Sequence, residues 1–381
     1  MGRDTPIRPI GILLLSPRGI CIGVYSISLP SKNQSLTPFL QSSVIMPGIR
    51  ERSPSPTPKD EAPRKGSKIQ RGGRLAGVGW NDVWNEVTSV MDKPSSLHAL
   101  VRDAFLESGV LAAEHMVNTD RIDNLVRAVQ AGYNLTPYHN FTHASHVFLS
   151  AVVLLREATV AFTRVEKAAL LFTAIIHDLE HQGVPNAQLV MEGSPLASQY
   201  SNKSVAENHS LSAAFAILED PDPARNCNVF ADFTVEEMVR FRHLCTSLIL
   251  ATDIGDKQRL DATYARVADA ILTYNSAGED AASAAAAAGA SAGTWYTAAA
   301  TNGGEDGEGG EETSISCSTS TSTRTEARFL AHLAANRELI LILILKLADV
   351  GAPMQQYATG IAWAERFYNE NRTAHKLGRG T

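Results

Sequence analysis

Histidines and acids stand in three places along this chain, each beside a run of apolar residues. They are His139 and His143; His177, Asp178 and His181; and Asp349. Burying an imidazole or a carboxylate next to apolar side chains is costly unless a partner pairs it. For any one group, the simple alternative is an ordinary hydrogen bond at a helix end. Because the pattern recurs, we favour a bound divalent metal, which histidine and carboxylate ligands suit.

Two imidazoles and two carboxylates would form a ligand set for one metal, with positions left for water. The set is His143, His177, Asp178 and Asp349. A carboxylate such as Asp178 can also bridge to a second, harder ion. Two metals about 3.5–4 Å apart can clamp a phosphate for in-line displacement, and a free histidine beside them can protonate the leaving oxygen. The residues therefore predict phosphoester hydrolysis.

Helices are the elements expected to position these residues. Apolar spacing predicts helices over residues 97–111, 121–130, 147–162, 168–176 and 238–250, with a helix pair over 198–218. His139 and His143 are expected to share one face of a helical turn, and His181 to share a face with His177. The apolar run 338–350 could be a strand, but its helical context favours a central buried helix. We predict an all-α, multi-helix catalytic domain.

Further motifs around these residues resemble one family, the class I cyclic nucleotide phosphodiesterases. The resemblance covers about residues 117–370, apart from residues 276–325. The matched motifs are Tyr138-His-Asn-x-x-His-Ala, His177-Asp-x-x-His-x-Gly-x-x-Asn186, Ser204-Val-x-Glu-Asn-His209, Leu250-Ala-Thr-Asp253, Ala348-Asp349 and Trp363-x-x-Arg366. Residues 226–230 and 246–253 are most similar to the high-affinity cyclic-GMP branch.

The resemblance implies hydrolysis of 3',5'-cyclic nucleotides to 5'-nucleotides, in cyclic-nucleotide signalling. It implies zinc at the first metal site and magnesium or manganese at the second, bridged by Asp178. His139 would be the general acid for the 3' oxygen, and His181 would contact the phosphate. The residues implied to orient waters of the second metal are Asn186, Glu207 and Thr252.

The nucleotide pocket implied by the resemblance is only partly present. Trp363 would pack near it, and Phe367 could form one side of the clamp around the base. Ala352 and Gly360 stand where the family usually has Asn and an aromatic or polar residue. The glutamine and Phe that hold the purine in the family would lie beyond Thr381. We therefore expect the catalytic domain to be incomplete at its C-terminus, with weak base discrimination.

Two other functions remain open. One is a general metal-dependent phosphohydrolase of the wider His-Asp helical class, which lacks the Tyr-His-Asn motif seen here. The other is a non-catalytic protein that keeps the metal site for stability or interaction.

Composition sets the remaining expectations. The chain has 381 residues, 44% of them apolar, and a net charge of −6, which gives no footprint for nucleic acid or an anionic membrane. Residues 1–79 are expected to be a disordered linker region before a catalytic domain over 80–381, and residues 276–325 a low-complexity insertion. Four scattered cysteines and no clear membrane anchor suggest a cytoplasmic protein, although residues 7–29 retain a weak targeting pattern. The sequence sets no oligomeric state.

Overall fold

A computed structural model describes residues 75, 77–111, 119–158, 160–222, 224–270 and 335–379, and the backbone of two strands near the N-terminus. The expected insertion 276–325 lies outside these residues, as does most of the expected linker region 1–79. Within that region, strands β1 (Ile10–Ser16) and β2 (Gly19–Tyr25) pair antiparallel, with Ile10 opposite Tyr25. The sequence analysis did not predict this hairpin.

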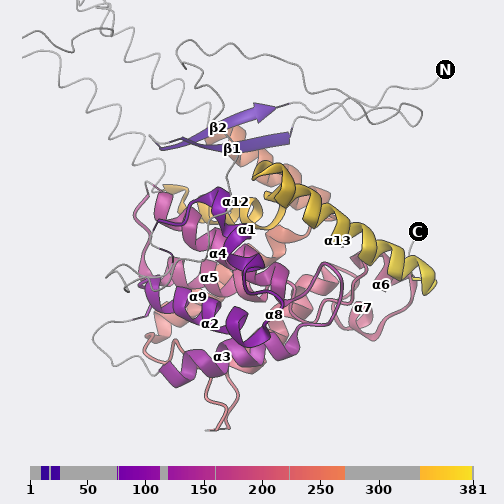
Figure 1. Cartoon of the computed structure of the whole chain (residues 1–381), viewed down its shortest axis with the longest axis horizontal. Helices are drawn as coiled ribbons and strands as arrows, with labels where there is room; N and C mark the ends of the chain where they lie inside the picture. The colour runs from indigo at the N-terminus through magenta and orange to yellow at the C-terminus, as the bar shows by residue number, and fades with distance from the viewer. Residues whose placement is uncertain are drawn as a thin grey trace, which may run out of the picture.

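The rest of the described chain is helical, which confirms the predicted all-α fold class (Figure 1). Residues 257–270 are also helical. The other helices are η1 (Trp80–Asp82), α1 (Val83–Thr88), α2 (Pro94–Glu107), α3 (Thr119–Gly132), α4 (Phe141–Glu157), α5 (Arg164–Ile176), α6 (Asn186–Met191), α7 (Pro195–Gln199), α8 (Val205–Leu218), α9 (Val235–Thr252), α12 (Arg337–Val350), η2 (Ala352–Met354) and α13 (Tyr357–Lys376).

Four helices, α4, α5, α9 and α12, form the centre of the core. α5 packs on α4 and α9, and α12 packs on α4, α9 and α5. Residues 338–350 are therefore a buried helix and not a strand, because every neighbour is helical and a strand would have no partner for its backbone hydrogen bonds. Local signals start two of these helices: Thr163 with Glu166 forms a capping box on α5, and Thr234 with Glu237 does so on α9.

The predicted bounds of one helix and the predicted helical placement of His181 were wrong, and both concern the candidate site. α4 starts at Phe141 and ends at Glu157, earlier at both ends than the predicted 147–162. Its start is set by Asn140, whose side chain accepts hydrogen bonds from the backbone N–H groups of Thr142 and His143. His139 therefore lies before the helix and does not share a helical turn with His143. Likewise α5 ends at Ile176, so His181 is not on a continuation of that helix.

The long helix α13 runs along the surface and reaches toward α6 and α7 (Figure 1). Its C-terminal end is held there by Arg379, which makes two hydrogen bonds to Glu192, at 3.0 and 2.8 Å. Its buried positions include Thr359, Trp363 and Glu370. Thus α13 covers one side of the cleft into which the C-terminal ends of α5 and α12 open. Among the helices of the described ranges, none has the length and apolar character needed to cross a bilayer.

Candidate functional site

The predicted metal ligands come from three helices that meet in the core. His143 lies in the first turn of α4, His177 caps the end of α5 and Asp178 follows it, and Asp349 is in the last turn of α12. Each is therefore at a helix end, where the chain leaves the apolar core. His143 and His177 are almost fully buried, at 1% and 2% exposure.

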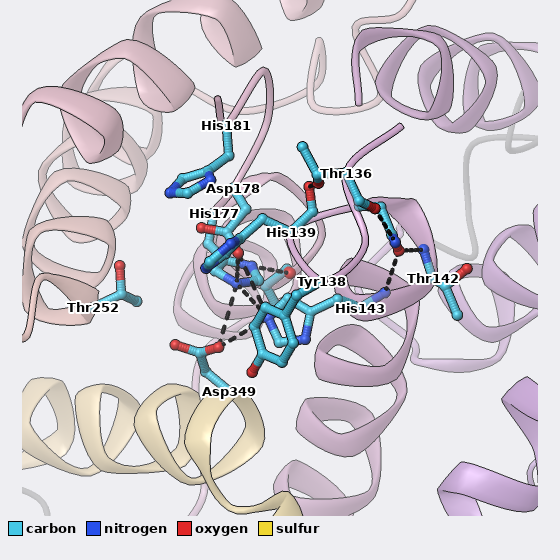
Figure 2. A network of polar contacts seen from close by, with 12 residues as sticks. Thr136, Tyr138, His139, Thr142, His143, His177, Asp178, His181, Thr252 and Asp349 are labelled. Atoms are coloured by element: carbon cyan, nitrogen blue, oxygen red, sulfur yellow. Dashed lines mark hydrogen bonds and ion pairs between the residues drawn. The ribbon is translucent and has the colours of Figure 1, made fainter. Parts of the chain in front are cut away.

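Their ligand atoms point at one another (Figure 2). His143 Nε2 lies 3.1 Å from Asp349 Oδ1, and His177 Nε2 lies 3.0 Å from Asp178 Oδ2. The two Nε2 atoms are 3.3 Å apart. Ligands of a tetrahedral metal at ~2.0–2.1 Å are separated by roughly 3.3–3.4 Å. The ligand atoms of His143, His177 and Asp349 all lie within 4.8 Å of one another, as the ligands of one metal would. Asp178 Oδ2 lies 3.0 Å from His177 Nε2 and 3.5 Å from His143 Nε2, beside this group.

The surroundings of these side chains set their protonation differently. His177 Nδ1 lies 3.0 Å from the carbonyl oxygen of Ala174, to which it can only donate, so Nε2 is the nitrogen available as a ligand. Burial lowers the pKa of His143 and so favours its neutral form. Burial alone would raise the pKa of Asp349, but the facing His177 outweighs it and lowers the pKa. At His177, the charges of Asp178 and Asp349 outweigh burial and raise the pKa well above its ordinary value. Because a metal takes neutral imidazoles and ionised carboxylates as ligands, its binding would release the proton that His177 holds between the two carboxylates.

His139 lies in front of these residues and is paired with an acid that the sequence analysis missed. Glu370, on α13, accepts hydrogen bonds from the backbone N–H groups of Tyr138 and His139, at 2.8 and 2.9 Å. Its other oxygen, Oε1, is bonded to His139 Nδ1. Nε2 is then the His139 nitrogen left to face the cleft. The one available signal was that Glu370 is an acid on the same helix stripe as Trp363.

Charge keeps this pair ionised. Burial pulls the pKa of His139 down, but Asp178 and Glu370 outweigh it and raise the pKa above its ordinary value. Burial pushes the pKa of Glu370 up, but the hydrogen bond from His139 outweighs it and lowers the pKa to about 2. The carboxylate of Glu370 thus favours the protonated imidazole of His139, which is the form a general acid needs.

His181 reaches His139 through an unusual turn. Glu180 has a φ of 61°, in the left-handed region, so the chain reverses directly after Asp178. The rings of His181 and His139 then stack, with centroids 3.8 Å apart. The Gly183 N–H donates to His181 Nδ1 at 3.1 Å, which leaves the proton on Nε2. Burial, and then the charge of His139, lowers the pKa of His181 to about 4, so it is a neutral hydrogen-bond donor.

Polar residues of α6, α8 and the end of α9 form the opposite side of the site. Asn186 donates to Glu207 at 2.8 Å and to Asp253 at 3.4 Å. Asp253 also accepts from the hydroxyl of Ser204 at 2.8 Å. Burial raises the pKa of Glu207 to about 7. The amide of Asn186 therefore holds Glu207 and Asp253 in place. Asp253 is a further residue whose part in the site the sequence analysis did not identify.

Most of these groups face one cleft of about 570 Å³. The predicted residues that line it are His139, Asp178, His181, Asn186, Glu207, Thr252, Asp349, Trp363 and Phe367. His143 and His177 lie behind its wall. Thr252 stands apart from the imidazoles, across the cleft from His139 (Figure 2). Phe367 is half exposed at the rim, whereas Trp363 is buried in the wall. Ala352 and Gly360, the two positions that depart from the family pattern, also line the cleft. The structure therefore brings every predicted site residue into or directly behind the wall of this cleft.

Similar proteins of known name are cyclic nucleotide phosphodiesterases. The chain is 30% identical over 193 residues to the probable 3',5'-cyclic-AMP phosphodiesterase pde-4 of Caenorhabditis elegans, covering 50% of this chain and 28% of that protein. It is 32% identical over 180 residues to the dual specificity calcium/calmodulin-dependent 3',5'-cyclic nucleotide phosphodiesterase 1B of Rattus norvegicus, covering 46% and 33%. The matches thus span about a third or less of these relatives.

A solved structure shares the fold. The phosphodiesterase domain of Salpingoeca rosetta rhodopsin phosphodiesterase matches with a TM-score of 0.56 at 23% identity, covering 80% of this chain and 74% of that one. The likeness at this identity concerns the fold alone.

A family model described as 3'5'-cyclic nucleotide phosphodiesterase matches residues 138–379, which is more than half of the chain. Its range contains the metal-ligand group, His139 and Glu370. This match agrees with the motifs and with the helical fold, and it confirms the resemblance seen in the sequence. The chain belongs to the 3',5'-cyclic nucleotide phosphodiesterase family.

Proposed function

We propose that this chain hydrolyses the 3' phosphoester of 3',5'-cyclic nucleotides to give 5'-nucleotides. The observation that carries the proposal is that His139, hydrogen-bonded to Glu370, lies beside the four candidate metal-ligand side chains at one cleft. This arrangement places a proton donor, His139, next to the site where metal ions would bind the phosphate. Within the described residues, no feature favours the general phosphohydrolase or the non-catalytic protein over this activity.

Family membership implies divalent metal, and the structure has a candidate group for it. We propose zinc at His143, His177, Asp178 and Asp349, and magnesium or manganese at a second site bridged by Asp178. When bound, the metals would supply positive charge to polarise the phosphate and activate water. Glu207 and Thr252 would orient waters of the second site, with Asn186 acting through Glu207.

The protein's own groups account for the proton that the leaving oxygen needs. As water attacks the phosphorus and the bond from phosphorus to the 3' oxygen breaks, His139 Nε2 gives its proton to that oxygen. The proton that the attacking water loses goes to solvent, and solvent reprotonates His139 for the next turnover. Glu370 stabilises the protonated imidazole through Nδ1 before the transfer. His181, as a neutral donor stacked on His139, would bind a phosphate oxygen. Phe367 at the rim of the cleft and Trp363 in its wall are aromatic rings against which the base would bind.

The direct test is turnover of cyclic AMP and cyclic GMP by the purified chain with added Zn²⁺ and Mg²⁺ or Mn²⁺. We expect 5'-nucleotides as the products, and loss of activity after chelation. A 3'-nucleotide product, or no turnover by metal-loaded folded protein, would refute the proposal. The same assay tests the expected weak discrimination between the adenine and guanine bases. The cytoplasmic location stays a proposal that fractionation can test.

Glu370→Gln should lower activity and shift its pH dependence. His139 must be protonated to act, so activity is lost as the pH rises through the pKa of His139. Removing the Glu370 charge lowers that pKa, so the loss should begin at a lower pH than in the wild type. We expect kcat near neutral pH to fall by roughly 10–100-fold, less than the ~10²–10⁴-fold that a general acid contributes.

Glu192→Gln is the matched control for this change. Glu192 pairs with Arg379 at the far end of α13 and makes no contact with His139. The pH profile of the Glu192→Gln variant should equal that of the wild type. An unchanged profile in Glu370→Gln would show that Glu370 only fastens α13 to the loop.

A further inference from the structure

A cluster of three rings lies at the cleft wall and includes a residue from the N-terminal helix α1. Trp84 contacts Trp363, with ring centroids 5.0 Å apart, and contacts His146 at 5.9 Å. His146 and Trp363 are themselves 5.3 Å apart. The three rings come from α1, α4 and α13, so they join segments that are distant in the sequence. Trp363 also lines the cleft, whereas Trp84 and His146 are not among its lining residues.

Hydrogen bonds through Gln355 also join η1, α4 and the segment before α13. Gln355 Nε2 donates to the carbonyl oxygen of Trp80 at 3.0 Å. Because that carbonyl can only accept, the Gln355 amide is oriented with Oε1 toward His146. His146 Nε2 lies 3.1 Å from Oε1 and must donate to it. Burial lowers the pKa of His146 to about 3, which keeps the imidazole neutral.

Trp363 carries the contact forward to the site. Its ring lies 5.3 Å from that of His143 and 5.5 Å from that of Tyr138, the neighbour of His139. Arg366, on the next turn of α13, lies over the Trp363 ring and hydrogen-bonds Met91 Sδ at 3.4 Å. Trp84 and Met91, near the start of the described helical domain, therefore both contact the first half of α13. Residues 80–91 all precede the match to the family model, which begins at residue 138.

We propose that Trp84 and the His146–Gln355 pair are positioning residues, through which η1 and α1 fix Trp363 and the first half of α13 at the cleft. This inference rests on the proposed function for its catalytic consequence. Its structural consequence is independent of that function. If residues upstream of Trp80 move α1, the same contacts would pass that movement to the nucleotide side of the cleft.

Hydrogen exchange and kinetics of Trp84→Ala test the proposal, with Val87→Ala as the matched control. Val87 is fully buried in the same short helix but has no ring contact with Trp363. Trp84→Ala should speed amide exchange in residues 357–367, and Val87→Ala should not. We also expect kcat/KM to fall by roughly 10–100-fold, because a small misplacement far from the chemistry can cost this much. The loss should fall mainly on KM, with metal content unchanged, and Trp84→Phe should restore most of it.

The following results would overturn the proposed positioning role of Trp84. Equal exchange and equal kinetics in Trp84→Ala and Val87→Ala, after allowing for stability, would overturn the proposal. If Trp84→Ala does not fold, Gln355→Leu cuts the link from Trp80 to His146 while keeping all three rings. It should speed exchange in residues 357–367, and unchanged exchange there would overturn the proposal. If the wild type turns over no cyclic nucleotide, the proposed function fails, but exchange in α13 still decides this inference.

Discussion

Asp349→Ala is expected to leave the purified chain with little tightly bound metal and almost no activity. Asp349 is the carboxylate that α12 brings to the two imidazoles, at 3.1 Å from His143 Nε2 and 3.5 Å from His177 Nε2. Losing even an outer-shell partner of a metal ligand typically costs ~10–100-fold in affinity. Loss of a direct ligand should cost more, and it also removes one negative charge from a buried site.

Metal analysis after gel filtration checks this result without an activity assay. Metal that binds only the folded state raises the melting temperature by mass action. The wild type should therefore melt at a higher temperature with added zinc, and Asp349→Ala should gain much less. Asp256→Ala is a suitable control, because Asp256 pairs with Arg259 outside the ligand group. Full metal occupancy in Asp349→Ala would show that the ligand assignment is wrong.

His139→Ala should keep its metal and lose catalysis. A general acid typically contributes ~10²–10⁴-fold, so we expect kcat to fall within this range. The ring of His139 contacts the ligand group but supplies none of its four ligands in the proposed site. A substrate with a good leaving group, such as a nitrophenyl phosphodiester, needs no protonation of the departing oxygen and should be hydrolysed nearly as fast by the variant as by the wild type.

The comparison of the two substrates separates chemistry from structure. His375→Ala, an exposed histidine near the end of α13, should leave both rates unchanged. If His139→Ala slowed both substrates equally, His139 would hold the cleft in shape instead of giving a proton. The His181 ring would then lose its stacking partner, and substrate binding would weaken in the same variant.

Sequence alone was sufficient for the elements whose signals are local. Long apolar runs predicted α5 and α12, because burying such a run requires a helix packed on all sides in this context. The pairing of those runs with His177, Asp178 and Asp349 predicted a metal group, because a buried histidine and carboxylate need a partner of that kind. The family followed from several spaced motifs, and the family-model match confirms it.

The starts of α4 and α5 show the limit of local signals. The Thr163 and Glu166 capping box is a short-range pattern that marks the start of α5 at Arg164, whereas the predicted range began at residue 168. Asn140 also caps α4 through side-chain hydrogen bonds, but a motif of closely spaced histidines suggested a continuous helical turn instead. The cap places His139 outside the helix, where it can face the cleft.

Only the tertiary structure decided the contacts that make the site work as a unit. His139 and Glu370 are 231 residues apart, and their pairing depends on α13 lying across the cleft. No periodicity within either segment encodes that packing. The placement of His181 depends on the left-handed backbone of Glu180, which no residue preference predicts for a glutamate. The ligand types were thus set by local chemistry, whereas the orientation of the proton donor was set by the packing of remote helices.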